Sequence, residues 1–148
     1  MPKKNLPVTV TMTVDLDEDY IRAVLTNAFE MGIGYWAQIA GVEANMSTTL
    51  FRTGTPMNPH GENSYAVMAM TEGCVIKLQD PEQTCTDADW TLTREKVIEG
   101  LKLLLASKDK NGKEFPRRHA NALLSENDDV ETADVLVQLA VLGEIVFG

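Results

Sequence analysis

The sequence has few cysteines and few histidines, and this shortage argues against a small protein held together by a structural zinc ion. Its 148 residues contain 2 cysteines and 2 histidines. Cys74 and Cys85 form no C-x-x-C pair and have no histidine cluster beside them, so the spacing of a structural zinc site is missing. We expect two reduced thiols, as is usual in the cytosol.

Basic residues are also scarce. The chain has 13 Lys and Arg against 22 Asp and Glu, which gives a net charge of −9. Sequence-independent binding of DNA or RNA depends on Lys and Arg that displace counterions from phosphates, so direct nucleic-acid binding is not expected. The acidity is compatible with plain solubility, or with an acidic surface that mimics nucleic acid and blocks a basic protein.

Long apolar runs and catalytic signature motifs are missing as well. No run reaches the roughly 18 residues that a membrane span requires, and no apolar segment typical of a signal peptide follows the first residues. The sequence has no P-loop, no G-x-S-x-G motif and no complete G-x-G-x-x-G motif after a strand. We therefore expect a cytoplasmic protein with no membrane partner and no cofactor, and an enzymatic role is the less favoured one.

The hydrophobic pattern predicts three strand segments or more. Apolar residues alternate with threonines over residues 8–14, which is typical of a half-buried strand. Two apolar runs, residues 65–70 and 74–78, are joined by a glycine turn and predict a β-hairpin. Residues 35–42 are compatible with a strand or a helical turn. Residues 45–63 are rich in Ser, Thr, Gly, Pro and Asn, which favours a long loop.

Two helices are predicted in the first two thirds of the chain. The first is capped by Asp15 or Asp17 and ends at the glycines of residues 32–34. The second is capped by Thr91 or Thr93, and its apolar residues recur at helical spacing.

Two further helices are predicted near the C-terminal end. Pro116 suits the first position of a short helix, and Asp128 or Asp129 caps a last helix that ends at about Leu142. The last helix is apolar on most of its circumference, so it is either a central helix or an oligomer interface, and we favour the interface. Residues 1–148 thus read as one α+β domain, with a small antiparallel sheet packed against about four helices.

Asp134 is the most unusual residue of the last helix, because it interrupts an apolar sequence. An unpaired buried carboxylate costs several kcal/mol, so it needs an arginine, an amide or a metal as partner. The nearest basic cluster is Arg117, Arg118 and His119. Because an arginine fork fits a carboxylate and a phosphate equally well, two interpretations follow. The cluster forms a salt bridge with Asp134, or it holds an anionic ligand that Asp134 helps to orient.

Two other pairs are candidate site residues. Glu131 and Asp134 are three residues apart on one helix face and could hold a divalent cation, although acidic residues also stabilise a helix start. Tyr35 and Trp36 follow two glycines and could stack on a base or ring, although such a pair is also typical of a core.

Three segments of the chain resemble a group of small phage and prophage proteins. They are AFEMGIGYW at residues 28–36, DDVETAD at residues 128–134 and LGEIVFG at residues 142–148. The resemblance implies a phage protein that acts in the cytosol of a bacterial host. Small accessory phage proteins often counter host defence, either by blocking a defence protein or by sequestering its nucleotide signal.

The last helix is also similar to a metal-binding motif of the MazG-like nucleotide pyrophosphatases. The residues that carry this similarity are Glu131 and Asp134, in an E-x-x-D pattern. It implies Mg²⁺-dependent nucleotide hydrolysis with these two carboxylates as ligands. The chain departs from that family in two ways. The upstream E-E-x-x-E helix is missing, and the family is all-helical whereas a β-hairpin is predicted for this chain.

The favoured functional hypothesis is a phage-type accessory protein that sequesters a small anionic ligand, such as a nucleotide immune signal. In this hypothesis Tyr35 and Trp36 stack on the ligand, Arg117, Arg118 and His119 hold its phosphates, and the last helix forms a homo-oligomer. The second hypothesis is an Mg²⁺-dependent nucleotide hydrolase. The third is an acidic inhibitor that binds a host defence protein.

Overall fold

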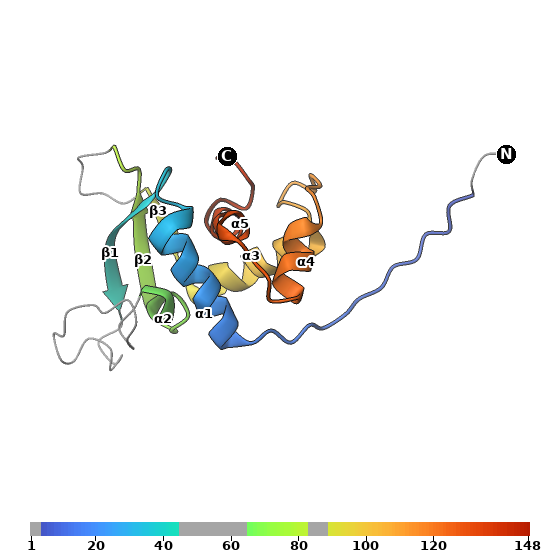
Figure 1. Ribbon diagram of the computed structural model, residues 1–148, viewed down its shortest axis with the longest axis horizontal. Helices are drawn as coiled ribbons and strands as arrows, with labels where there is room; N and C mark the ends of the chain where they lie inside the picture. Colours follow the sequence, from blue (N-terminus) through green and yellow to red (C-terminus); the bar gives the residue numbers. More distant parts are fainter. Residues whose placement is uncertain (1–3, 45–64, 83–88) are drawn as a thin grey trace.

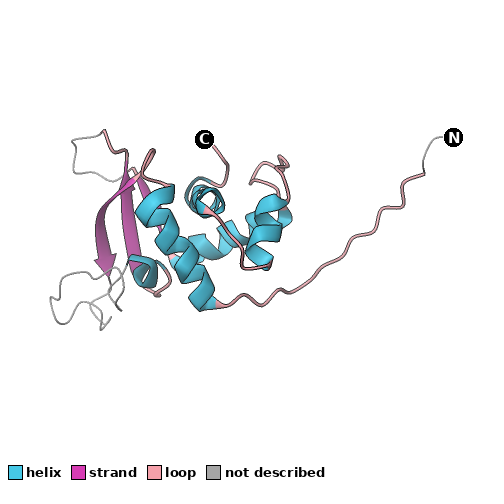
Figure 2. Cartoon of the chain, in the orientation of Figure 1, coloured by secondary structure: helices cyan, strands magenta, loops and turns pink. Residues whose placement is uncertain are grey.

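A computed structural model describes residues 4–44, 65–82 and 89–148, in which a three-stranded sheet lies against a layer of helices (Figure 1). The helices lie on one side of the sheet, as the colouring by secondary structure shows (Figure 2). The predicted α+β class, with a small antiparallel sheet packed on helices, is confirmed.

The sheet consists of β1 (Gln38–Ala44), β2 (Cys74–Gln79) and β3 (Trp90–Leu92), in the order β1-β2-β3 with both pairings antiparallel. Side chains of β2 alternate between buried and half-buried, because successive residues of a strand point to opposite faces. The pattern of residues 35–42 was compatible with a strand or a helical turn. The structure forms a strand there, and it begins at Gln38.

The predicted hairpin over residues 65–78 is wrong. Its first half forms the short helix α2 (Tyr65–Ala69), and Gly73, with a φ of 83°, makes the turn into β2. Short apolar runs do not distinguish a strand from a buried helical turn, and here tertiary contacts decide for the helix. The partner strands of β2 are instead β1, which is separated from it by residues 45–73, and β3, which follows after residues 80–89.

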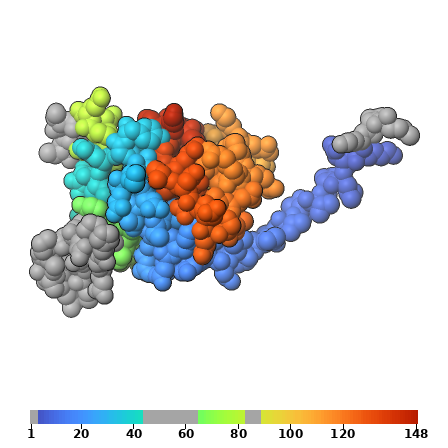
Figure 3. Space-filling model, viewed as in Figure 1, coloured from blue at the N-terminus to red at the C-terminus, as the bar shows by residue number. Residues whose placement is uncertain are grey.

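The predicted strand over residues 8–14 is also not formed. This segment makes no strand pairing with the described part of the chain, and Val8, Val10 and Met12 are 69–74% exposed. It runs outward from the packed body as an extended arm (Figure 3).

Three of the predicted helix caps are confirmed. Asp17 caps α1 (Glu18–Asn27), which continues into the π-helical turn η1 (Ala28–Gly32). Thr93 caps α3 (Arg94–Ala106), and Asp129 caps α5 (Val130–Leu142). In each case the side-chain oxygen accepts a hydrogen bond from a free backbone amide of the first turn. The short helix α4 (Arg118–Leu124) begins two residues after Pro116.

Helix α5 lies at the centre of the molecule. Its residues 132–140 are all buried, and it packs against α1, η1, α3, α4 and β3. The single chain therefore covers the apolar circumference of α5, and the fold needs no second copy for this purpose. A homo-oligomer through α5 remains a prediction. At 13 residues each, α3 and α5 are the longest described helices, and none of the described helices could cross a lipid bilayer.

Candidate ligand pocket

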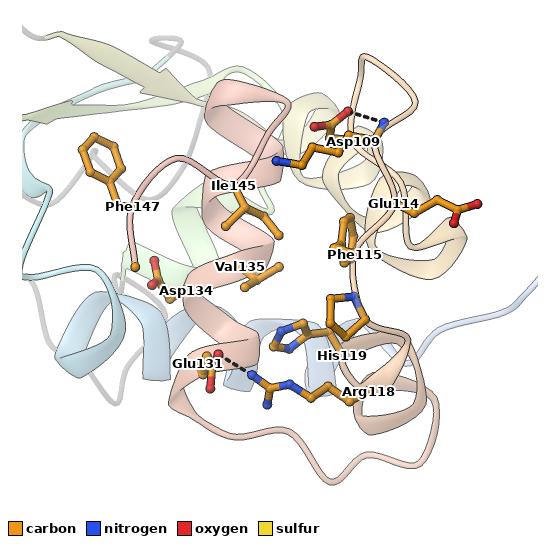
Figure 4. A pocket seen from close by; sticks show the side chains of 13 residues that line it. Asp109, Glu114, Phe115, Arg118, His119, Glu131, Asp134, Val135, Ile145 and Phe147 are labelled. Carbon is orange, nitrogen blue, oxygen red and sulfur yellow. Dashed lines mark hydrogen bonds and ion pairs between the residues drawn. The ribbon is translucent and has the colours of Figure 1, made fainter.

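A cavity of about 450 Å³ lies between α5, the start of α4, the connection from α3 to α4 and the C-terminal residues 143–148 (Figure 4). Apolar side chains from all of these parts except α4 point toward it, and basic and acidic side chains surround them. The residues that line it are Asp109, Lys113, Glu114, Phe115, Pro116, Arg118, His119, Glu131, Asp134, Val135, Ile145, Phe147 and Gly148.

The connection from α3 to α4 is folded back on itself, and this carries Phe115 to the pocket. The Asp109 carboxylate accepts hydrogen bonds from the backbone amides of Asn111 and Lys113, at 2.8 and 2.9 Å. Gly112 has a φ of 81°, which glycine adopts at no steric cost, and this allows the chain to turn after Asn111. The amide of Phe115 then donates to the carbonyl of Ser107 at 3.0 Å.

His119 is a buried polar residue of the pocket lining. Its side chain comes from the first turn of α4 and is 4% exposed, with Nδ1 2.8 Å from the hydroxyl of Thr132 on α5. Burial, together with the positive charge of Arg118, lowers the pKa of His119, so the imidazole is neutral at neutral pH. Nε2 has no hydrogen-bond partner among the described residues, which leaves it available to a ligand.

Arg118 forms an ion pair with Glu131, at the start of α5. The two side chains are 53% and 60% exposed, so the pair lies at the edge of the pocket, where an ion pair contributes little to stability. The basic cluster therefore does not form the predicted salt bridge with Asp134. Arg117 is exposed and lies outside the pocket lining.

Asp134 instead receives three hydrogen bonds from neutral donors. The Tyr35 hydroxyl donates to Oδ2 at 2.5 Å, and Trp36 Nε1 and Gln138 Nε2 donate to Oδ1 at 2.8 and 3.1 Å. The carboxylate is 7% exposed, and these donors replace the water that it loses on burial. Burial of the Tyr35 hydroxyl and its hydrogen bond to Asp134 raise the pKa of Tyr35.

Trp36 belongs to an aromatic cluster in the core. It is 3% exposed, and its ring is stacked on Phe147, with centroids 5.0 Å apart and an angle of 9° between the rings. Trp90 meets Trp36 edge-on at 5.3 Å. Neither Trp36 nor Tyr35 lines the pocket, so the structure does not bring this pair together with Arg118 and His119.

Gln138 holds the C-terminal segment against α5. Its side chain is fully buried; Oε1 accepts from the amides of Val146 and Phe147 at 2.8 and 2.9 Å, and Nε2 donates to the Phe147 carbonyl at 3.0 Å. These bonds place Ile145 and Phe147 in the pocket wall. The sequence contained one signal for this role, a second polar residue one turn after Asp134 in an apolar helix.

Several pocket residues could not be identified from the sequence, because no local sequence pattern distinguishes them. Lys113 and Phe115 lie in a short connection, and Ile145 and Phe147 lie beyond the last helix. Their contribution depends on how the chain folds back, which no spacing rule describes.

The candidate metal ligands Glu131 and Asp134 both line the pocket, but each is already engaged. Glu131 pairs with Arg118, and Asp134 accepts from Tyr35, Trp36 and Gln138. Within the described ranges, no group of three or more His, Cys, Asp or Glu side chains is arranged to hold a metal ion.

Comparisons of this chain with protein-family models, with curated proteins and with solved structures found no match. The function is therefore inferred from the chemistry of the pocket.

Proposed function

We propose that this protein binds and sequesters a small anionic ligand of the nucleotide class in the pocket between α4, α5 and residues 143–148. The observation that carries this is the juxtaposition of Arg118 and His119 with an apolar wall. Phe115, Val135 and Ile145 point into the same space (Figure 4). A planar ring would pack against these apolar side chains, while a phosphate or carboxylate would face α4.

The acidic residues of the pocket do not oppose an anion as strongly as their number suggests. The Asp109 carboxylate is occupied by backbone amides and the Asp134 carboxylate by three donors. The side chain of Glu114 is 79% exposed and points away from the cavity (Figure 4). Lys113 forms no ion pair with any described residue, so its charge is available.

We expect a ligand to bind by replacing Glu131 as the partner of Arg118. A ligand phosphate would take the place of Glu131 on the guanidinium, because an arginine fork donates hydrogen bonds to both groups in the same geometry. His119 Nε2 would then form a hydrogen bond to a neighbouring ligand atom, with its ring held by Thr132. In the phage context that the sequence resemblance implies, the ligand would be a nucleotide signal of host defence, captured in the host cytosol.

A release assay distinguishes sequestration from the other two functions. The protein is incubated with Mg²⁺ and a panel of cyclic oligonucleotides, NAD-derived signals and nucleoside triphosphates, and each compound is quantified by chromatography before and after denaturation of the protein. A compound that disappears and returns intact supports sequestration. Recovery of products instead supports the Mg²⁺-dependent hydrolase, and a panel that stays free throughout favours the acidic inhibitor of a host protein.

Two variants of one ion pair test the site itself. We expect Arg118→Ala to weaken ligand binding about tenfold or more, since a charge-assisted hydrogen bond contributes about 1.5–3 kcal/mol. Glu131→Gln should strengthen binding, because it removes the carboxylate that competes for Arg118. Isothermal titration calorimetry with the compound found in the release assay measures both effects.

The matched control is Arg117→Ala, an exposed arginine beside the pocket that does not line it. It should leave affinity unchanged, and equal losses in the two arginine variants would contradict the assignment. A hydrolase using Glu131 as a metal ligand would respond in the opposite way, because Glu131→Gln would then abolish turnover.

A further inference from the structure

The N-terminal arm carries an apolar stripe that nothing in the described chain covers. Val8, Val10 and Met12 are 71%, 69% and 74% exposed, and threonines alternate with them on the other face. Regular alternation of β-branched and polar residues is typical of a strand with one buried face. The arm therefore has the sequence pattern of a strand but does not pair with the described sheet of its own chain.

The described part of the chain leaves one edge of the sheet, that of β1, without a strand partner. Among the described residues, β1 pairs only with β2. Its apolar residues Ile39 and Val42, which pack against the core, are only half-buried, whereas Ile76 and Leu78 of β2 are fully buried. An unpaired strand edge next to half-buried apolar residues is a template for another strand.

The other edge of the sheet fits an incoming strand less well. β3 is 3 residues long, and its Trp90 is already packed against Trp36 and Phe147. β1 is 7 residues long, the same length as the alternating segment of residues 8–14.

The arm is anchored at the start of α1 and runs away from β1 of its own chain. Leu16 packs against the core and Asp17 caps α1, so only Asp15 separates residues 8–14 from this anchor. One residue spans at most about 3.6 Å. In Figure 1 the arm leaves α1 in the direction away from the sheet, and β1 is the strand at the far side.

We propose that residues 8–14 of one copy add as a strand to the β1 edge of a second copy, in a reciprocal exchange that forms a dimer. The apolar face of the arm would cover Ile39 and Val42, and its threonines would share the open face of the sheet with Lys77. Because each copy offers one arm and one edge, the exchange closes with twofold symmetry. This dimer involves neither α5 nor the ligand pocket.

The mass of the full chain in solution tests the exchange. Sedimentation and light scattering across a concentration series should give twice the chain mass of 16.3 kDa. Removal of residues 2–14 should give a monomer with an unchanged circular dichroism spectrum of the helices. A wild-type protein that stays monomeric at every concentration, or a shortened chain that stays dimeric, would overturn the assignment.

Paired substitutions on the two faces of the arm separate the stripe from general effects of charge. Val10→Asp with Met12→Asp should dissociate the dimer, whereas Thr11→Asp with Thr13→Asp adds the same charge on the other face and should leave it intact. Equal dissociation by both pairs would contradict a one-sided apolar contact.

A photo-crosslinking residue at Thr11 identifies the docking strand. In mixtures of isotopically heavy and light chains, we expect cross-links between the arm of one chain and the β1 peptide of the other. Cross-links confined to single chains would show that the arm folds onto its own sheet and would overturn the exchange.

Discussion

Glu131 and Asp134 lie one helical turn apart on α5, yet their partners are of opposite kinds. Glu131 pairs with the guanidinium of Arg118 at the surface, whereas Asp134 is buried and accepts from Tyr35, Trp36 and Gln138. The anomaly of Asp134 was visible in the sequence, as was the need for a partner. The identity of the donors was not, because Tyr35 and Trp36 are about a hundred residues away in the chain.

His119 should make stability depend on pH. Its pKa in the folded protein is lowered from 6.5, because burial and the charge of Arg118 disfavour the imidazolium. As the pH falls below 6.5, the unfolded chain takes up a proton at this residue and the folded chain does not, so the free energy of unfolding falls. Above pH 6.5 both states are neutral there, and this contribution is complete.

Denaturant unfolding measured at several pH values between about 7 and 5 checks this expectation. His119→Asn should have a shallower decline in the free energy of unfolding than the wild type. Parallel pH profiles for the two proteins would rule out His119 as the origin of the dependence.

Among the secondary-structure elements, helices were more predictable than strands. The caps Asp17, Thr93 and Asp129 are local signals, since each acts on amides two or three residues away. Strand pairing is less local, and here β2 pairs with β1 across residues 45–73 and with β3 across residues 80–89. Residues 65–70 had an apolar pattern that suits a strand, but they fold as helix α2.

The contact between α3 and α5 depends on the absence of a side chain at Gly100. A Cβ atom there would lie 2.8 Å from the backbone nitrogen of Ala140, so the two helices would have to separate. We expect Gly100→Ala to lower the free energy of unfolding by about 1–3 kcal/mol, although alanine is the better helix former. Denaturant unfolding measures this change.

Gly34→Ala is the matched control for this substitution. A Cβ atom at Gly34 meets nothing within 4 Å, so its effect should stay within about 0.5 kcal/mol. Similar losses in the two variants would mean that the close approach of α3 and α5 is not what Gly100 provides.

At the scale of the whole molecule, the C-terminal segment joins the sheet side of the core to the pocket. Phe147 stacks on Trp36, contacts Trp90 from β3 and also lines the pocket. We expect Phe147→Ala to lower the free energy of unfolding by about 1–3 kcal/mol, less than for a fully buried phenylalanine, and to weaken ligand binding. Tryptophan fluorescence should shift to the red because Trp36 loses its cover.

Val146→Ala is the control for the neighbouring position, since Val146 is 55% exposed and does not line the pocket. It should change neither the fluorescence nor the binding. An unshifted spectrum in Phe147→Ala would contradict the role of this ring as the cover of Trp36.

The sequence alone determined the α+β class, the caps of the long helices and the burial of the last one, because capping and helical periodicity act over a few residues. It also marked Asp134 as a residue in need of a partner, and Arg118 and His119 as candidates for binding it or an anionic ligand. The tertiary structure decided which partners they have, since those contacts join segments far apart in the chain. It also assigned Trp36 to the core and left residues 8–14 uncovered, because burial depends on what the rest of the chain places beside a residue.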